Sequence, residues 1–497
     1  MTSTGEARGN DFSLAPGPSF DDAWRRLVFP RDYRNPQPAP CYNLTVIGAG
    51  PAGLVTAIAA TGLGAKVALV ERHAMGGDCL NVGCIPSKTL LAGAAGGLSF
   101  ADAMARVKRV RAQIAQHDSV ERFVKAGVDV FLGEATFERA NEVRVGEAVL
   151  RARRIVIATG ARAAIPPIPG LSELAPLTNE TVFDLAGQPR RLAILGAGPI
   201  GCELAQAFVL LGTHVDLIEI EPQVLPREDA DAARLIAGAL ARDGVGIHLG
   251  VRVACASRSP EGKTLVLEDG TRIETDEVLV AVGRLRNVEA LHLENAGVRF
   301  DPKSGIEVDA SLRTSQRNIF AVGDVCSPYQ FTHVADAHAR VVIRNALFHS
   351  RARVDRLVIP WCTFTRPELA RAGATSRELE RAGRAYDRYR IGFGELDRGR
   401  TDDATDGYAE VLTAKGTDRI IGTTIVGKDA GEQIAPVVLM MVRGIGLREL
   451  SALVVTYPTR SEYLRRLADA YSRTRLTPRV ARILKWWLAR GHRAPRN

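Results

Sequence analysis

Two cysteines stand five positions apart in the segment GGDCLNVGCIPSK, residues 76–88. Cys79 and Cys84 could be packed core sulfurs, zinc ligands or the two halves of a reversible disulfide. Zinc would need two more Cys or His residues at short spacing, and none stands nearby. The residues after Cys84 predict a helix, and a cysteine at a helix N-terminus has a lowered pKa and more of the nucleophilic thiolate. The pattern therefore favours thiol–disulfide chemistry, with a packed pair as the alternative.

The segment that carries these cysteines follows the first copy of an internal repeat. LTVIGAGPAG, ending at Gly53, recurs as LAILGAGPIG, ending at Gly201, and each copy predicts a strand, a G-x-G-x-x-G turn and a helix. Each copy then reaches a strand that ends in an acid, Glu71 or Glu219, 23 residues after the first glycine (71 − 48 and 219 − 196). The glycines allow a tight turn and the approach of a pyrophosphate, and the acid binds a ribose diol. Two matched copies predict two dinucleotide-binding folds.

The second acid bears on the choice of nicotinamide nucleotide. Glu219 favours a free ribose 2′-hydroxyl and repels a 2′-phosphate. No arginine stands at residues 218–221, and the nearest one beyond them is Arg227. We therefore expect NADH rather than NADPH.

The bulk composition predicts a globular protein of about three domains. Of its 497 residues, 46% are hydrophobic and 24% are charged. The first dozen residues contain no apolar run, and the seven scattered cysteines do not resemble a secreted disulfide framework, so we expect a cytoplasmic protein. Residues 44–65 are uncharged and long enough to span a bilayer, but the glycine turn interrupts them, so they predict a buried strand and helix.

The net charge of +9 is concentrated near the C-terminus. From Thr459 onward there are 11 Lys and Arg residues and 2 acids, which argues against a nucleic-acid-binding surface on the rest of the protein. In the tail, residues 471–497, four apolar residues recur at helical intervals: Leu476, Val480, Ile483 and Trp487. This basic amphipathic helix is expected either to pack on the body of the protein or to lie weakly on an anionic membrane surface, as in peripheral proteins.

The cysteine segment resembles the redox-active motif of the FAD-dependent pyridine nucleotide–disulfide oxidoreductases, which include lipoamide dehydrogenase, glutathione reductase and mercuric reductase. Four further segments agree with this family in order and spacing: ATG at 158–160, VAVGR at 280–284, NIFAVGD at 318–324 and YPTRSE at 457–462. The resemblance covers residues 42 to about 470. It implies an α/β fold with two Rossmann-like dinucleotide-binding domains and an α+β C-terminal dimerisation domain. The expected parts are a partly disordered N-terminal extension (1–41), an FAD-binding domain (42–186), an NAD(P)-binding domain (187–284), a second FAD-binding or central part (285–355), a dimerisation domain (356–470) and the basic tail (471–497).

The resemblance also implies a role for each matching residue. FAD would be held by Gly48, Gly50, Gly53, Glu71 and Asp324, and the nicotinamide nucleotide by Gly196, Gly198, Gly201 and Glu219. Further cofactor contacts are implied for Gly77, Lys88, Thr159, Gly160 and Gly283. Cys84 would face the flavin as the charge-transfer thiolate and Cys79 would meet the substrate, while Lys88 and Glu203 would lie beside the flavin and nicotinamide. Electrons would pass from NADH to FAD, then to the Cys79–Cys84 disulfide and on to a small-molecule acceptor, with no resident metal.

The last motif departs from that of the disulfide reductases. In lipoamide dehydrogenase and glutathione reductase the last motif resembles H-P-T-x-S-E, and its histidine is the acid–base, held by the glutamate. In this chain the corresponding residues are Tyr457 and Glu462. A tyrosine titrates near pH 10 and is a poor base at neutral pH, so exchange with a dithiol should be slow. A tyrosine at this position makes the motif similar to that of the mercuric reductases. Two features of the mercuric reductases are not matched: no cysteine follows Cys362 to form their C-terminal pair, and no metal-binding domain is expected before residue 42.

The sequence is therefore identified as mercuric reductase-like, with the acceptor open between a mercuric ion, a disulfide and a quinone. One alternative is a dihydrolipoyl dehydrogenase or another small-disulfide reductase. An alternative of another class is a flavin- and nucleotide-binding protein whose redox state is a signal and whose basic tail recruits it to a membrane or a partner. The family resemblance also implies a homodimer in which Tyr457 and Glu462 face Cys79 of the partner subunit.

Overall fold

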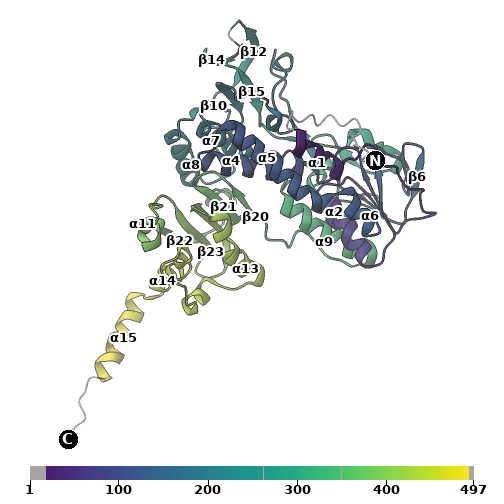
Figure 1. Cartoon of the computed structure of the whole chain (residues 1–497). Coiled ribbons are helices and arrows are strands. Elements are labelled where there is room, and N and C mark those ends of the chain that lie inside the picture. The colour runs from purple at the N-terminus through teal and green to yellow at the C-terminus, as the bar shows by residue number, and fades with distance from the viewer. Residues whose placement is uncertain (1–17, 261, 349, 492–497) are drawn as a thin grey trace. The chain divides into compact units, whose positions relative to one another are not determined.

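The computed structural model describes residues 18–260, 262–348 and 350–491, and these form two compact units (Figure 1). Unit 1 contains the chain up to Pro222 together with Leu240–Leu357, and unit 2 contains Gln223–Ala239 and the chain from Val358 onward. Each unit has its own sheets and its own core, and each is described by itself.

The first large sheet of unit 1 is a five-stranded parallel sheet in the order β19-β7-β1-β2-β3. Its strands are β1 (Leu44–Ile47), β2 (Val67–Glu71), β3 (Asp129–Leu132), β7 (Ile155–Ile157) and β19 (Ile319–Ala321). Strands β1, β2, β7 and β19 are buried along their whole length, which explains their uninterrupted apolar sequences. The chain order reverses beside β1, so ligands of such a sheet bind at the end of β1, where the first glycine turn begins.

The second large sheet repeats this arrangement with four parallel strands in the order β11-β10-β9-β15. The strands are β9 (Arg191–Leu195), β10 (His214–Glu219), β11 (Gly246–Leu249) and β15 (Glu277–Val280). The second glycine turn follows β9, as the first follows β1. The two predicted Rossmann-like folds are therefore confirmed.

Helices cover these sheets. They are α1 (Pro18–Val28), α2 (Pro51–Gly62), α3 (Gly77–Asn81), α4 (Cys84–Ala95), α5 (Phe100–Ala115), α6 (Val120–Lys125), α7 (Pro199–Leu210) and α9 (Thr332–Phe348). Helix α2 packs along α9, and α4 packs against both α5 and α7, so α4 connects the two nucleotide-binding folds (Figure 1).

Short antiparallel sheets complete unit 1: β4 (Ala135–Arg139), β5 (Glu142–Val145) and β6 (Ala148–Arg151); β12 (Val253–Ser259), β13 (Gly262–Leu267) and β14 (Arg272–Thr275); β8 (Ala161–Ala163) with β16 (Arg284–Arg286); and β17 (Phe300–Asp301) with β18 (Gly305–Ile306).

Unit 2 is built on an antiparallel five-stranded sheet in the order β20-β21-β24-β23-β22. Its strands are β20 (Pro360–Thr363), β21 (Glu368–Gly373), β22 (Tyr386–Gly392), β23 (Tyr408–Ala414) and β24 (Ile420–Gly427). Its helices are most of α8 (Ala230–Arg242), then α10 (Ser376–Arg381), α11 (Asp397–Thr401), α12 (Ala430–Gln433), α13 (Ala435–Arg443), α14 (Tyr463–Arg475) and α15 (Pro478–Gly491). This is the α+β domain predicted for the C-terminal part of the chain.

The described part of the N-terminal extension, residues 18–41, contains a helix and contacts the body of unit 1. Residues 1–17, which carry part of the predicted disorder, lie outside the described residues. Residues 18–41 include helix α1, whose Trp24 is 1% exposed in the core of unit 1. Further along, the Asn35 side chain forms two hydrogen bonds with the backbone of Leu132 at the edge strand β3. A short amphipathic helix in a segment rich in proline and charge is hard to separate from disorder by composition alone.

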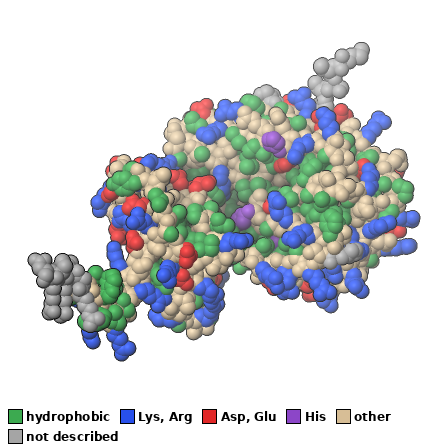
Figure 2. All heavy atoms as spheres, turned by 90° about the horizontal axis from the view of Figure 1, so that it is seen from below, with side chains coloured by type: hydrophobic (Ala, Val, Ile, Leu, Met, Phe, Trp, Pro, Cys, Tyr) green, Lys and Arg blue, Asp and Glu red, His purple; other side chains and the backbone are tan. Residues whose placement is uncertain are grey.

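Of the four apolar tail residues predicted on one helix, Val480, Ile483 and Trp487 lie on α15, whereas Leu476 lies in the break before it, and all four side chains are exposed within the described structure. Helix α14 packs Leu464, Leu467 and Tyr471 into the core, and α15 begins after a break at residues 476–477. From Ser472 to Ala489 every side chain except the half-buried Ala481 is exposed. Figure 2 shows hydrophobic (green) and basic (blue) side chains next to each other on the segment that leads to the grey C-terminal residues.

Candidate redox site

The two cysteines meet at the junction of α3 and α4. Cys79 lies in the middle of α3 and Cys84 is the first residue of α4, and both are free thiols, with Cys79 half-buried and Cys84 exposed. The sulfur of Cys84 lies 3.4 Å from the hydroxyl oxygen of Thr332, the first residue of α9. The sequence brought the cysteines together but gave no indication of Thr332, which stands 248 positions away from Cys84.

The environment separates the acidities of the two thiols. A hydrogen bond from the Cys79 thiol lowers the pKa of Cys84, and the Thr332 hydroxyl and the positive charge of Lys88 lower that pKa further. The same hydrogen bond, together with burial, raises the pKa of Cys79. The start of α4 adds the positive end of the helix dipole at Cys84. In the reduced pair, therefore, Cys84 is the thiolate and Cys79 keeps its proton.

An ion pair links this site to the second nucleotide-binding fold. Lys88 lies one turn after Cys84 on α4, and its Nζ is 2.6 Å from Oε2 of Glu203 on α7. The Glu203 side chain is 5% exposed, and that of Lys88 is 35% exposed. A buried carboxylate needs such a partner, because burying it alone would be costly. The structure thus brings together four residues that the sequence singled out at separate positions.

The first glycine turn has the close approaches that only glycine permits. A Cβ on Gly48, whose φ is +102°, would lie 2.4 Å from the carbonyl oxygen of Ala158. A Cβ on Gly53 would lie 1.8 Å from the carbonyl oxygen of Gly48, and one on Gly77 would lie 2.6 Å from Gly50 Cα. The glycines of the turn and of the cysteine segment therefore pack directly against each other, which fixes the cysteines beside the start of α2.

The acid at the end of β2 is anchored to the same turn. The Glu71 carboxylate accepts hydrogen bonds from the backbone N–H groups of Ala49 at 2.6 Å and His73 at 2.7 Å. Burial raises the pKa of Glu71. Helix α2 has no side-chain cap at its N-terminus, so its first N–H groups are available for a phosphate. These residues fit the adenosine and pyrophosphate parts of FAD.

The second turn repeats this geometry. A Cβ on Gly196, whose φ is +100°, would lie 2.6 Å from the Ala281 carbonyl oxygen, and one on Gly201 would lie 1.9 Å from the Gly196 carbonyl oxygen. A Cβ on Gly198 would meet nothing within 4 Å, so this glycine faces open space where a nucleotide could approach. The Glu219 carboxylate accepts hydrogen bonds from Ala197 N–H at 2.7 Å and Glu221 N–H at 3.0 Å.

Two of the remaining predicted cofactor residues, Asp324 and Gly283, lie beside an arginine that was not among the predicted site residues. Arg284, in VAVGR, lies 3.5 Å from the Asp324 carboxylate and also pairs with Asp78, the residue before Cys79. Burial raises the pKa of Asp324. Gly283 adjoins this arginine, with φ of +139°. Thr159 and Gly160 instead bond to Asn287: the Thr159 hydroxyl donates to the Asn287 carbonyl oxygen at 2.8 Å, and the Asn287 N–H donates to the Gly160 carbonyl oxygen at 3.1 Å. Its position in VAVGR, directly after the predicted cofactor residue Gly283, was the signal that could have identified Arg284.

The final motif lies in unit 2. The Tyr457 hydroxyl donates a hydrogen bond to Asp397 at 2.7 Å, and this contact raises the pKa of Tyr457 above its usual value. Glu462 instead pairs with Arg466 on the next turn, 2.8 Å away. Tyr457 and Glu462 thus each contact a side chain outside the predicted set, Asp397 and Arg466. Asp397 was not among the predicted site residues, because it lies 60 positions before Tyr457 and no motif connects the two.

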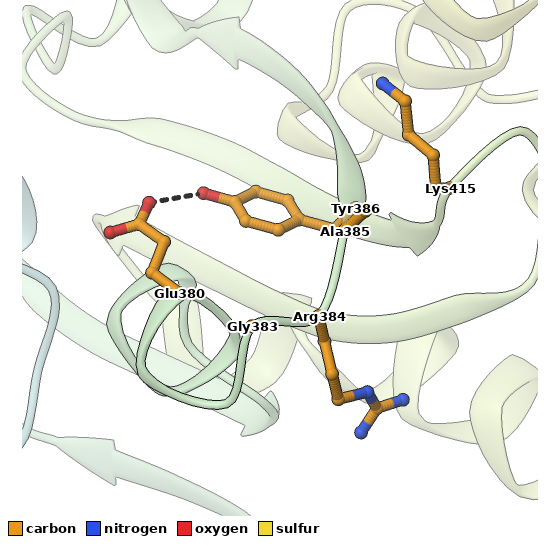
Figure 3. Close-up of a pocket in the computed structure, with 6 residues that line it drawn as sticks. All are labelled: Glu380, Gly383, Arg384, Ala385, Tyr386 and Lys415. Carbon is orange, nitrogen blue, oxygen red and sulfur yellow. Dashed lines mark hydrogen bonds between the residues drawn. The ribbon is translucent and has the colours of Figure 1, made fainter.

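Unit 2 also has a hollow at the end of α10 (Figure 3). It is lined by Glu380, Gly383, Arg384, Ala385, Tyr386 and Lys415. The Tyr386 hydroxyl donates to Glu380 at 2.8 Å, whereas Lys415 pairs with Asp387. None of the six lining residues belongs to the motifs described above, and none is a thiol, so this hollow contributes nothing to the redox pair.

Two dinucleotide-type turns, with a pair of unequal thiols packed against the first, define a nucleotide-dependent dithiol oxidoreductase. A model of the family described as pyridine nucleotide-disulphide oxidoreductase matches residues 42–339, and a model of its dimerisation domain matches residues 359–468. The chain therefore belongs to the pyridine nucleotide-disulphide oxidoreductase family.

Individual relatives fall into more than one activity class. The chain is 31% identical over 452 residues to a mercuric reductase of Staphylococcus aureus (87% of this chain and 83% of the relative). It is 34% identical over 468 residues to dihydrolipoyl dehydrogenase 3 of Pseudomonas aeruginosa (87% and 98%). The solved Cu(II) complex of the HOCl-induced flavoprotein disulfide reductase RclA from Escherichia coli matches with a TM-score of 0.81 and 30% identity, over 87% of this chain and 99% of that chain.

Membership of this family confirms the class of enzyme that the sequence predicted. The protein is a flavoprotein disulfide reductase that uses FAD and a pyridine nucleotide, and its dimerisation domain supports the predicted homodimer. Within the described residues, no helix combines the length and apolar character needed to cross a bilayer.

Proposed function

We propose that the protein is a mercuric reductase-like, NADH-dependent oxidoreductase that passes the electrons of NADH to a thiophilic metal ion held by the sulfur atoms of Cys79 and Cys84. The observation that carries this proposal is the Tyr457–Asp397 hydrogen bond, because it leaves the final motif without a neutral-pH base. In the overall reaction NADH and one mercuric ion give NAD⁺, a proton and elemental mercury, whereas with cupric ion NADH and two ions give NAD⁺, a proton and two cuprous ions. FAD, when bound, accepts the hydride of NADH and passes the electron pair onward.

The residues of the chain have distinct tasks in this scheme. The two glycine turns bind the pyrophosphates, with Glu71 and Glu219 at the riboses. Lys88 supplies positive charge where negative charge develops during hydride transfer, and Glu203 fixes its position. Cys84 is poised as a thiolate by Cys79, Thr332 and Lys88, so it can bind a soft metal ion without first losing a proton at neutral pH.

A metal acceptor agrees with the loss of the histidine. Exchange between the pair and a dithiol such as dihydrolipoamide requires proton transfer to and from sulfur, whereas reduction of a thiolate-bound metal does not. Among the relatives, one is a mercuric reductase and another is described as a Cu(II) complex, which supports a metal as the acceptor class. Dihydrolipoyl dehydrogenase remains the second candidate because of the 34% identity to that enzyme of Pseudomonas aeruginosa.

NADH is the proposed nucleotide, and the proposed assembly is a homodimer. The Glu219 carboxylate is fixed by two backbone N–H groups where a ribose 2′-phosphate would have to sit. The dimer would bring Tyr457 and Glu462 of one subunit to Cys79 of the other, and the proposed compartment is the cytoplasm. In a protein whose redox state is only a signal, the ion-paired Lys88 and Glu203 would have no task, which favours a turning-over enzyme.

For the basic tail, the proposal is a weak contact with an anionic membrane surface through α15. At 100° per residue, one face of α15 carries Val480, Ile483, Leu484, Trp487 and Leu488, and these side chains are 40–65% exposed. The opposite face carries Arg479, Arg482 and Lys485, and no acidic residue follows Asp469. A helix of this kind lies in the interface, with its apolar face among acyl chains and its cations at anionic headgroups.

Vesicle flotation of the holoenzyme tests the tail proposal. We expect binding to phosphatidylcholine vesicles that contain phosphatidylglycerol, at least tenfold weaker binding to phosphatidylcholine alone, and loss of binding at high salt. The double variant Leu484→Glu, Trp487→Glu should abolish binding. Ala489→Glu places a negative charge on the opposite face and should weaken binding only modestly. Equal binding of the apolar-face variant, or a change only in the dimer equilibrium, would show that α15 packs against protein instead.

Steady-state oxidation of NADH by a panel of acceptors tests the enzymatic proposal. The panel is mercuric ion, cupric ion, glutathione disulfide and a quinone, with dihydrolipoamide and NAD⁺ assayed in the opposite direction. We expect the highest kcat/KM with a metal ion and its loss in Cys79→Ser and Cys84→Ser. A higher kcat/KM with dihydrolipoamide would identify a lipoyl dehydrogenase instead, and the absence of turnover with every acceptor would favour a signalling protein.

A further inference from the structure

Helix α1 lies before the part of the chain that matches the family, yet it reaches the redox loop, here residues 74–84. The Trp24 indole Nε1–H donates a buried hydrogen bond to the side-chain oxygen of Asn81 at 2.8 Å. A second contact joins the same segments, because the Met75 N–H donates to the carbonyl oxygen of Val28 at 3.1 Å. The N-terminal extension is therefore bonded to both ends of the turn that holds Cys79.

Asn81 is the residue through which Trp24 reaches the cysteine. Its carboxamide nitrogen donates to the backbone carbonyl oxygens of Met75 at 3.2 Å and Gly77 at 2.9 Å, and more weakly to that of Ala74. These carbonyls lead into α3, where Cys79 stands two residues before Asn81. Both Trp24 and Asn81 are almost completely excluded from solvent. A single carboxamide thus holds the turn, and its oxygen is oriented by the indole.

The indole is itself held in place by charge. The Arg111 guanidinium on α5 lies over the Trp24 ring, 5.0 Å from its centre, and donates to the backbone oxygen of Asn81 at 3.1 Å. Asp21, three residues before Trp24 on α1, pairs with Arg111 at 3.4 Å and with Lys108 at 3.1 Å. Buried polar groups linked in this way fix one arrangement, because each lost partner would leave another group unsatisfied.

We propose that Trp24 is a positioning residue for the redox pair: through Asn81 it fixes the turn of α3 and so directs the Cys79 thiol toward Cys84. This inference rests on the proposed thiol chemistry of the pair. Without the indole N–H, the Asn81 oxygen is buried without its donor, and the carboxamide must turn or admit water. Cys79 then donates less well to Cys84, and the thiolate at Cys84 is less stabilised. An element outside the family core thereby tunes the reactivity of the pair.

The test compares two substitutions that each delete one hydrogen-bond donor from the N-terminal extension. Trp24→Phe removes the bond to Asn81 and keeps an aromatic ring. Tyr33→Phe removes the 2.8 Å bond from the Tyr33 hydroxyl to the Val130 carbonyl oxygen, on a strand away from the cysteines. In the NADH-reduced holoenzyme, the pH at which the long-wavelength thiolate absorbance disappears is measured, together with the rate of Cys79 alkylation, the FAD content and the melting temperature.

Trp24→Phe should move the thiolate midpoint upward by roughly half a pH unit and change the alkylation rate about threefold, the equivalent of a weakened hydrogen bond to a charged group. Tyr33→Phe should leave both unchanged despite a comparable loss of melting temperature. In an Asn81→Ala background, Trp24→Phe should have no additional effect on the thiolate midpoint. Equal effects of the two substitutions, or no effect of Trp24→Phe on the midpoint and the alkylation rate, would overturn the proposal. Failure of the proposed redox function would instead appear as an absence of NADH-generated thiols in the wild-type protein.

Discussion

Lys88 Nζ lies 2.6 Å from Glu203 Oε2, and this ion pair connects the helix that starts at Cys84 with the helix that starts at the second glycine turn. The pair therefore stands where the two nucleotide-binding folds meet. A cation held there by a buried carboxylate can influence both the hydride transfer and the Cys84 thiolate. The first prediction tests the hydride transfer through Lys88, and the second tests the thiolate through its other partner, Thr332.

The first prediction concerns hydride transfer from NADH. Lys88→Met removes the positive charge but keeps most of the side-chain volume, so flavin reduction measured by stopped-flow absorbance should slow by about 10²-fold, the scale of losing one electrostatic stabiliser. Glu203→Gln should slow it less, because Lys88 remains but loses its fixed position. Lys66, which also pairs with a carboxylate at 2.6 Å, provides the control, and Lys66→Met should leave the rate unchanged. Equal rates in Lys88→Met and wild type would contradict the assignment.

The second prediction concerns the pH dependence of the Cys84 thiolate. Since the pKa of Cys84 is lowered, the thiolate persists as the pH falls below the ordinary range of a free thiol and is lost only when the pH passes the lowered pKa. Thr332→Val removes one stabilising hydroxyl without changing the side-chain size, so the thiolate should disappear at a pH about one unit higher. Thr332→Ser keeps the hydroxyl and should behave as wild type. The readout is the long-wavelength absorbance of the NADH-reduced protein, and a downward shift in Thr332→Val would be inconsistent with the structure.

The third prediction concerns the acceptor. Tyr457→His would supply a base near neutral pH, with Asp397 available to orient the ring, so activity with dihydrolipoamide should rise by about 10²-fold. Tyr457→Phe should leave metal-ion reduction within about twofold of wild type, because no proton from residue 457 is needed there. A large loss of metal reduction in Tyr457→Phe would show that the hydroxyl takes part in the reaction.

The fourth prediction concerns the nicotinamide nucleotide. Glu219→Ala removes both the ribose partner and the charge that repels a 2′-phosphate, so kcat/KM for NADH should fall and the NADH-to-NADPH preference should drop by at least tenfold. Glu221→Ala, two residues further on, removes a charge that does not bind the Ala197 N–H and should leave the ratio nearly unchanged. A wild-type enzyme that already prefers NADPH would refute the assignment.

The parts of the structure that could be predicted from the sequence are those that local sequence patterns determine. Gly48 and Gly53 could be assigned because their spacing is needed for a turn whose close contacts, 2.4 Å and 1.8 Å from a hypothetical Cβ, exclude any other residue. The buried strands could be predicted from apolar runs, because parallel strands covered on both faces need apolar side chains throughout. Cys79 and Cys84 were found because they lie within one short segment.

The contacts between predicted site residues and their other partners could not be predicted, because they join segments that are far apart in the chain. Thr332 meets Cys84, Asp397 meets Tyr457, and Trp24 meets Asn81 across 57 positions. In each pair one residue lies in a recognised motif, but no pattern in the sequence points to its partner. The tail illustrates a different limit. Its amphipathic period predicted a helix correctly, but a period does not indicate whether the apolar face is covered by the protein or by another surface.

The most direct test of the central claim is a count of thiols before and after reduction by NADH. The oxidised, FAD-loaded holoenzyme is reduced anaerobically with NADH, quenched with an alkylating reagent under denaturing conditions, and analysed by peptide mass spectrometry. The account predicts two additional alkylated cysteines per chain, located at Cys79 and Cys84, and no gain in Cys84→Ser. An unchanged thiol count in the wild-type protein would contradict it, because the electrons would then never have reached the sulfur pair.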